Sequence, residues 1–170
     1  SEGFPVCPFD FQGKDDWQTW SPKVGASYAL SDEAQVYGHW SRGFRSGGYN
    51  LRNTTPLFPP EAFDEEQVDN IELGYKSQQS WGRLNAAFFY TTVDDMQREI
   101  NLADPDAGVV QIIRNSADAT LWGLELDGTF SLSESLLLLT SVGYIDSSYD
   151  DVFFDLNGDG IVDAADVAVM

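Results

Sequence analysis

The stretch Asn70-Ile71-Glu72-Leu73-Gly74-Tyr75-Lys76 alternates polar and apolar side chains along its whole length. In an extended chain, Ile71, Leu73 and Tyr75 would lie on one face and their neighbours on the other. Alternation of this kind predicts a β-strand with one apolar face. The same pattern recurs along the chain and helical spacing is nearly absent, so we expect an all-β fold.

Three further stretches alternate in the same way. Their apolar faces would comprise Val24, Ala26, Tyr28 and Leu30; Leu84, Ala86, Phe88 and Tyr90; and Trp122, Leu124, Leu126 and Phe130. We predict six antiparallel strands in three hairpins. Their expected positions are near residues 22–30, 35–48, 68–78, 83–100, 110–130 and 136–148.

The predicted connections differ in length at the two ends of the strands. Short polar links occur at 31–33, 78–82 and 131–135, and each is rich in turn-forming residues. Long polar stretches comprise the first 20 or so residues, 50–67, 102–108 and everything after Tyr149. Long strands with short turns at one end and long loops at the other favour an outer-membrane barrel. A soluble sandwich, which buries the apolar face against a second sheet, is the alternative.

Composition narrows the possible functions. The 170 residues carry 28 acidic and 9 basic side chains, a formal net charge of −19, which argues against a nucleic-acid partner. Apolar residues reach 42% and aromatics 14%, too many for a disordered acidic tail, and no apolar run is long enough for a membrane-spanning helix. The sole histidine, His39, excludes a catalytic triad with histidine within this chain, and adjacent acid pairs point to opposite strand faces. We therefore predict that the chain is not an enzyme.

Several local sequences resemble the barrel region of TonB-dependent outer-membrane receptors. The first two are Ser21-Pro22-Lys23-Val24-Gly25 and Tyr37-Gly38-His39-Trp40-Ser41-Arg42-Gly43-Phe44-Arg45-Ser46-Gly47-Gly48-Tyr49-Asn50. Val68 to Lys76 resembles that family's "ELGYK" strand, and Arg114 to Leu126 resembles another of its strands. The resemblance covers roughly Trp20 to Asp150, and these sequences occur in the family's order.

The resemblance implies an antiparallel barrel of 22 strands in the bacterial outer membrane. Such a barrel surrounds a plug domain and imports a scarce small-molecule ligand, such as a metal-siderophore, with energy from the TonB complex. About six strands cannot close such a barrel, and a plug and a TonB-contacting box are not in this sequence. We therefore expect residues 1–150 to be an incomplete transmembrane β-barrel segment, with lipid and lipopolysaccharide as its surroundings.

Arg42 and Arg45 are the candidate ligand-binding residues. They lie in a glycine-rich stretch whose strand is expected to rise toward the long-loop side, where guanidinium groups would meet an anionic ligand. Two structural alternatives are that they neutralise lumen carboxylates such as Glu72 and Glu125, or that they hold lipopolysaccharide phosphate. Cys7 is the only cysteine, and we interpret it as a loop residue rather than a reactive thiol.

Residues 155–166 match a twelve-residue calcium loop. Calcium needs six to eight oxygen ligands, which such a loop supplies from positions 1, 3, 5, 7, 9 and 12, with glycine at position 6. The predicted ligands of a structural Ca²⁺ are Asp155, Asn157, Asp159, Ile161 through its carbonyl, Asp163 and Asp166. The loop resembles those of EF-hands and, more closely, of dockerin modules. We expect residues 151–170 to form an extracellular loop with this site; an acidic loop that matches by chance is the alternative.

Two functions are consistent with these observations. The preferred one is a fragment of an outer-membrane transporter that imports a scarce ligand, with a ferric siderophore as the family's commonest case. The other is a secreted or surface-attached β-rich interaction module with a dockerin-like calcium loop. In the transporter, residues 50–67 and the calcium loop would lie outside the cell, with Asp32 and Gln79 in periplasmic turns.

Overall fold

The computed structural model describes residues 13–51, 60–104 and 108–152. Eight strands occur in these residues: β1 (Lys23–Ser31), β2 (Ala34–Arg45), β3 (Gly48–Tyr49), β4 (Ala62–Phe63), β5 (Glu66–Gln79), β6 (Gly82–Asp104), β7 (Gly108–Ser133) and β8 (Leu136–Val152). None of the described residues belongs to a helix long and apolar enough to cross a membrane. The expected all-β fold is confirmed.

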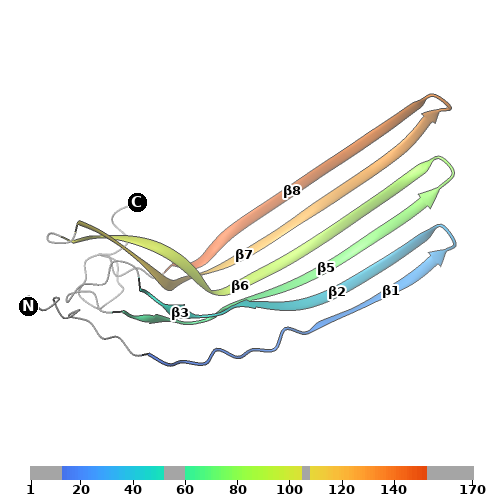
Figure 1. The fold of residues 1–170 in the computed structure, drawn as a ribbon. Helices are drawn as coiled ribbons and strands as arrows, with labels where there is room; N and C mark the ends of the chain where they lie inside the picture. Colours follow the sequence, from blue (N-terminus) through green and yellow to red (C-terminus); the bar gives the residue numbers. More distant parts are fainter. Residues whose placement is uncertain (1–12, 52–59, 105–107, 153–170) are drawn as a thin grey trace, which may run out of the picture.

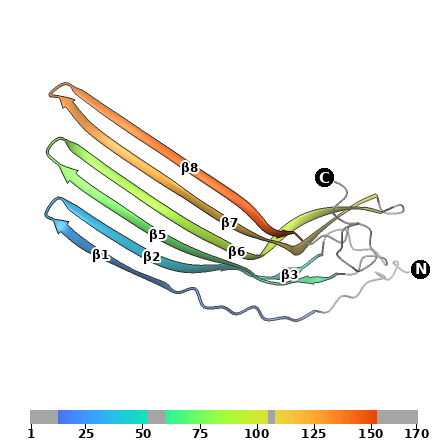
Figure 2. The same cartoon turned by 180° about the vertical axis from the view of Figure 1, so that it is seen from behind.

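Six of the strands form one antiparallel sheet in the order β1-β2-β5-β6-β7-β8, so neighbours in sequence are neighbours in space. Three hairpin turns lie together at one end of this sheet (Figure 1) and are seen at the same end from behind (Figure 2). They fall at residues 32–33, 80–81 and 134–135, inside the three predicted links. The six predicted strands and three hairpins are therefore confirmed.

The turn between β5 and β6 requires a glycine. Gly82 has a φ of 154°, a value that side-chain-bearing residues rarely adopt, and a Cβ there would lie 2.1 Å from the Thr129 carbonyl oxygen. The carbonyl of Trp81, the turn residue directly before Gly82, accepts a hydrogen bond of 2.8 Å from the Ser131 amide of β7. The glycine thus allows this hairpin to lie close against β7.

The predicted loop at 102–108 is wrong. β6 and β7 continue as paired strands to Asp104 and Gly108, so only residues 105–107 separate them. The alternating pattern weakens there because this part of the hairpin extends beyond the six-stranded body of the sheet. Figures 1 and 2 show β6 and β7 changing direction together before they continue outward.

A bulge accounts for this change of direction. The β6–β7 register shifts between Val93 and Met96, and Asp95 adopts a φ of 54°. An extra residue on one strand bends the ladder, and aspartate tolerates the left-handed region better than most residues. The Asp95 amide donates a 2.9 Å hydrogen bond to the Asp118 carboxylate of β7, which holds the bulge in place.

The small antiparallel pair of β3 and β4 was not predicted. Gly48 pairs with Phe63 and Tyr49 with Ala62 within the long connection between β2 and β5. The adjacent Gly47 has no room for a side chain, since a Cβ would lie 2.3 Å from both the Phe63 carbonyl oxygen and the Trp17 indole nitrogen.

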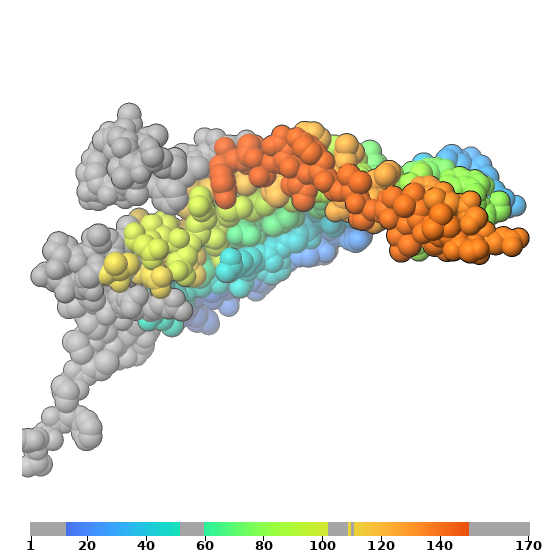
Figure 3. All heavy atoms as spheres, turned by 90° about the horizontal axis from the view of Figure 1, so that it is seen from above, coloured from blue at the N-terminus to red at the C-terminus, as the bar shows by residue number. Residues whose placement is uncertain are grey.

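The six-stranded sheet is a single layer with almost no core. Seen from above, the colours of the spheres change from blue through green to orange across the sheet, in the order of its strands (Figure 3). Among the described residues, the buried hydrophobic side chains are only Val93, Ile112, Ala117 and Ala119, all on β6 and β7. The apolar face predicted from the alternation is exposed, with Leu73 at 56% and Leu124 at 51%. No second sheet of a sandwich covers it among these residues.

Candidate functional site

The strand register sorts the side chains into two faces. In an antiparallel ladder, directly paired residues point to the same side of the sheet. Tyr28, Val36, Tyr75, Ala86, Leu126 and Val142 form one continuous row across the six strands. Leu73 and Phe88 share this face, which we call the outer face; Lys76, Asn85, Glu125 and Asp127 share the opposite one, the inner face. Tyr28, Leu73, Phe88 and Leu126 lie together on the outer face, so the apolar face predicted from the alternation is confirmed.

A row of three aromatic residues and one isoleucine crosses the outer face toward the ends of the strands that lie away from the hairpin turns. It contains Trp40, Ile71, Tyr90 and Trp122, which are direct neighbours in the register. The Trp122 ring lies 6.4 Å from Phe88 and 5.4 Å from Tyr144, so it packs with residues one row nearer the turns. Beyond it, Arg42, Asp69, Thr92, Thr120 and Ser148 form a polar row.

A second aromatic pair borders the outer face near the hairpin turns. The Trp81 and Phe130 rings are stacked, with centroids 5.8 Å apart and planes 1° from parallel. From Trp122 to Phe130, at about 3.3 Å per residue and a tilt of about 40°, the apolar surface spans roughly 20 Å along the membrane normal. The apolar band of outer-membrane barrels is about 25 Å tall and bordered by aromatic residues on both sides. The outer face therefore has the dimensions and borders of a lipid-facing surface.

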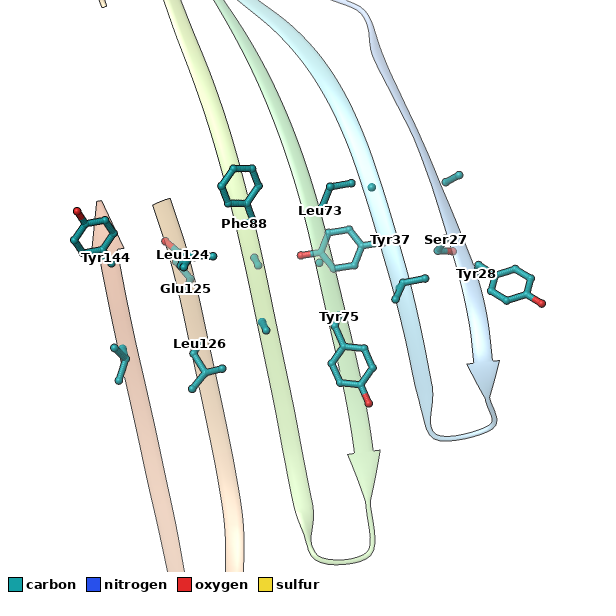
Figure 4. Close-up of a pocket in the computed structure, with 17 residues that line it drawn as sticks. Ser27, Tyr28, Tyr37, Leu73, Tyr75, Phe88, Leu124, Glu125, Leu126 and Tyr144 are labelled. Atoms are coloured by element: carbon teal, nitrogen blue, oxygen red, sulfur yellow. The ribbon is translucent and has the colours of Figure 1, made fainter. Parts of the chain in front are cut away.

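A broad apolar hollow of about 1030 Å³ lies along this sheet. Most of its lining comes from the outer face, and Figure 4 shows Leu73, Phe88 and Leu126 contributing from three neighbouring strands. Such an open, apolar surface offers little for recognising a charged ligand. We attribute it to the lipid-facing surface rather than to a ligand site.

The inner face carries a polar cluster. The Tyr37 hydroxyl donates a 2.8 Å hydrogen bond to the Glu72 carboxylate, and the Lys76 ammonium lies 4.8 Å from the centre of the Tyr37 ring. Figure 4 shows this ring extending from β2 toward β5. Gly74 provides the space, because a Cβ there would lie 2.2 Å from the ring. The inner face thus combines charged, hydroxyl and aromatic groups, as expected of a lumen-facing surface.

The structure separates the two predicted ligand-binding arginines. Arg42 shares the outer face with Trp40, and its guanidinium lies 2.7 Å from the Asp69 carboxylate. Its partner is therefore neither Glu72 nor Glu125. Arg45 is paired with Glu66 in the register, on the inner face with His39. His39 therefore lies on the face opposite to that of its neighbour Trp40.

The β3–β4 pair packs near the end of the sheet that lies away from the hairpin turns. Trp17 contacts Tyr49 edge to face, with ring centroids 5.9 Å apart. The Tyr49 hydroxyl donates a hydrogen bond to the Asp15 carboxylate, and this bond raises the pKa of the Tyr49 phenol above its usual value. Hydrogen bonds from Asn50, Gln97 and Asn115, which the sequence patterns did not reveal, join this pair to β6 and β7.

The predicted calcium ligands Asp155, Asn157, Asp159, Ile161, Asp163 and Asp166 lie outside the described residues, as does Cys7. Within residues 13–51, 60–104 and 108–152, no cluster of three or more metal-binding side chains occurs.

A single antiparallel sheet with a bordered apolar face and a polar face is the architecture of a membrane-spanning β-barrel wall. The family described as "TonB dependent receptor-like, beta-barrel" matches residues 4–166, so the chain belongs to this family. The resemblance to TonB-dependent receptors is confirmed. The barrels of this family are outer-membrane proteins of Gram-negative bacteria, and the family comprises transporters and receptors rather than enzymes.

Similar proteins and solved structures each match about three quarters of the chain. The pesticin receptor of Yersinia enterocolitica is 33% identical over 120 residues, which are 71% of this chain and 17% of that receptor. The ferric yersiniabactin uptake receptor FyuA from Yersinia pestis superposes with a TM-score of 0.63 at 27% identity, over 77% of this chain and 19% of that one. BauA, the ferric preacinetobactin receptor from Acinetobacter baumannii, shares the fold, with a TM-score of 0.53 at 18% identity over 75% of this chain and 18% of BauA. The chain thus spans less than a quarter of the length of these relatives.

Proposed function

We propose that this sheet is part of the barrel wall of an outer-membrane transporter that imports a ferric siderophore. The observation that carries the proposal is the segregation of the two faces within a chain of the TonB-dependent receptor family. A barrel needs an apolar surface toward lipid and a polar surface toward its lumen, and this sheet has both.

The relatives support the ligand class. FyuA is named for the uptake of ferric yersiniabactin and BauA for ferric preacinetobactin, both of which are iron complexes. Family membership argues against the alternative of a secreted interaction module, because the family's barrels lie in the outer membrane. In our proposal the TonB complex supplies energy through a plug domain in another part of the full-length protein, and the barrel surface contacts lipid and lipopolysaccharide.

Of the two arginines, Arg45 is the better candidate for an anionic ligand. It lies on the inner face near the end of β2 that leads into the β3–β4 connection, and its side chain is exposed. Arg42 uses its Nε and Nη2 groups to bind Asp69 on the outer face. A ligand entering the lumen from the long-loop side would therefore meet Arg45 and not Arg42.

Iron uptake by the full-length protein tests this proposal. The protein would be expressed in a bacterium that lacks its own siderophore receptors, and radioactive iron would be supplied as a panel of ferric siderophores. We expect uptake of at least one of them, abolished when TonB is deleted.

An Arg45→Gln variant should take up the same siderophore with a higher half-saturation concentration. Arg42→Gln is the matched control, since it removes the same charge from the outer face. Binding and uptake of only an iron-free ligand would contradict the proposed ligand class, and uptake that persists without TonB would contradict the mechanism.

We also propose that residues 155–166 bind a structural Ca²⁺ outside the cell. The support is the ligand spacing in the sequence, with oxygen donors at each required position and Gly160 at position 6. At millimolar extracellular calcium, a dissociation constant of about 10⁻⁴ M, typical of extracellular modules, would keep the site mostly occupied.

A further inference from the structure

Asn50 joins the β3–β4 pair to the middle of the outer part of β7. Its side-chain amide nitrogen donates a 2.8 Å hydrogen bond to the Ile113 carbonyl, and its Oδ1 accepts a 2.7 Å bond from the Ile113 amide. The carboxamide therefore occupies the place that a neighbouring strand's peptide group would take. The Asn50 amide is itself bonded to the Glu61 carbonyl at 2.9 Å, so this contact is continuous with the β3–β4 ladder.

Asn115 makes the reciprocal contact from β7. Its Oδ1 accepts a 2.7 Å hydrogen bond from the Asp64 amide, and its Nδ2 donates to the Asp64 carbonyl at 3.0 Å. The same Nδ2 group also donates to the Asp95 carbonyl at 2.7 Å. Asn115 thus links the segment after β4 to the bulge that sets the direction of the hairpin.

Gln97 is the buried member of the set, with 8% of its surface exposed. Its Nε2 donates to the Ser46 carbonyl at 3.0 Å and to the Asp64 carbonyl at 2.9 Å, with a longer contact of 3.4 Å to the Arg45 carbonyl. Its backbone amide donates a 2.8 Å hydrogen bond to the Glu66 carboxylate. The Gln97 side chain therefore contacts both Ser46, which precedes β3 in sequence, and Asp64, which follows β4.

We propose that Asn50, Gln97 and Asn115, here called the carboxamide clamp, hold the β3–β4 pair and the outer β6–β7 hairpin together as one rigid unit. Each carboxamide satisfies backbone groups that would otherwise be left without partners on separation, which is costly where the contact is buried. Two of the four buried hydrophobic side chains of the described residues, Ile112 and Ala117, lie on this outer part of the hairpin, and the other two, Val93 and Ala119, lie just before the bulge. Breaking the hydrogen bonds of one carboxamide would therefore expose those of the other two to solvent.

This coupling has a consequence for the surface beyond the sheet. Residues 46–51 and 60–66 lie before and after the connection at 52–59, whereas the outer part of the β6–β7 hairpin belongs to another connection. The hydrogen bonds that join the two segments link residues 31 to 63 positions apart in sequence. With the clamp intact, a displacement of either segment moves both. The proposal requires no ligand and is independent of the transport function.

Hydrogen exchange by mass spectrometry on the full-length protein tests the clamp. The variant is Gln97→Glu, which keeps the shape but turns a carboxylate oxygen toward the carbonyls of Ser46 and Asp64. We expect amide exchange to rise about tenfold or more, both in peptides covering 60–66 and in those covering 108–116. The Ile113 and Asp64 amides keep their acceptors Asn50 and Asn115 in this variant, so faster exchange there reports separation of the two segments.

Gln78→Glu is the matched control, because it makes the same chemical change beside the hairpin turn at the other end of β5 and should leave both regions unchanged. Asn50→Leu is the second variant, in case Gln97→Glu fails to fold. It deletes only bonds to Ile113, yet the clamp predicts faster exchange at Asp64 as well. Faster exchange confined to the residues that lose a direct bond, or no change in either variant, would overturn the proposal.

Discussion

The Arg42 guanidinium and the Asp69 carboxylate form a bidentate ion pair, with Nε to Oδ1 at 3.0 Å and Nη2 to Oδ2 at 2.7 Å. The Trp40 indole nitrogen donates to the same Oδ1 at 2.9 Å. All three side chains lie on the outer face, where the apolar band gives way to the polar row. At this border an indole can lie against acyl chains while its N–H group reaches a polar acceptor. The ion pair thus marks the predicted edge of the hydrocarbon region.

Breaking this ion pair from either side should lower the thermal unfolding temperature of the full-length protein in detergent. Asp69→Asn removes the negative charge but keeps the shape, and Arg42→Gln removes the positive charge. Because the two residues act on each other, the double variant should lose less than the sum of the single losses. Strictly additive losses would show that the pair is not coupled in the folded protein.

Placing arginine at the centre of the outer face should be costly. We expect Leu126→Arg to destabilise the full-length protein by about 2–4 kcal/mol in a bilayer, the cost measured for arginine near the midplane of outer-membrane barrels. Asn85→Arg is the control, because it adds the same charge on the inner face. Reversible folding into lipid vesicles, followed by denaturant titration, gives both values. Equal losses would contradict the assignment of the two faces.

Much of this architecture could be predicted from the sequence because the signal is local. Alternation at Ile71, Leu73 and Tyr75 reports one apolar face, and a turn between two such runs reports a hairpin. The orientation of His39 followed from its position next to Trp40. The same alternation places Arg42 on Trp40's face, away from the lumen carboxylates predicted as its partners.

Other features depend on contacts between distant segments and could not be predicted locally. The partner of Arg42 depends on the register of β2 against β5, which sets Asp69 opposite it. The outer part of the β6–β7 hairpin has weak alternation because it extends beyond the six-stranded sheet. It contacts the β3–β4 pair there instead of separating lipid from a lumen. Asn50 and Ile113 are 63 residues apart, and nothing in either neighbourhood indicates that a side chain replaces a strand partner.

Substituting Gly82 should destabilise the β5–β6 turn. In Gly82→Ala the new Cβ would meet the Thr129 carbonyl oxygen at 2.1 Å, and the φ of 154° would be strained, so we expect a loss of about 1–3 kcal/mol. Gly143→Ala is the control, since nothing lies within 4 Å of its added Cβ. Urea titration of the two variants in detergent would show the difference. An equal effect at both positions would mean that the turn has another conformation.

Calcium binding should depend on the acidic loop near the end of the sequence. Four aspartates within residues 155–166 repel one another, and a divalent ion would convert that repulsion into coordination. Changing Asp155 and Asp159 together to Ala should abolish binding measured by calorimetry on the full-length protein. Removal of Asp32 and Glu134, two acids in hairpin turns, should leave it unchanged. Unchanged calcium binding in the first variant would contradict the proposed site and support the alternative, a solvated acidic loop.

The central claim is that the outer face of this sheet contacts lipid. Spin labels placed one at a time from residue 71 to residue 76, in full-length protein with Cys7→Ser, would report the contact of each side chain with oxygen dissolved in the bilayer and with a water-soluble nickel chelate. We predict high oxygen contact at 71, 73 and 75, and a clear fall at 72 and 76, where nickel contact should be the greater of the two. Uniform values along the strand, or the opposite alternation, would contradict the account.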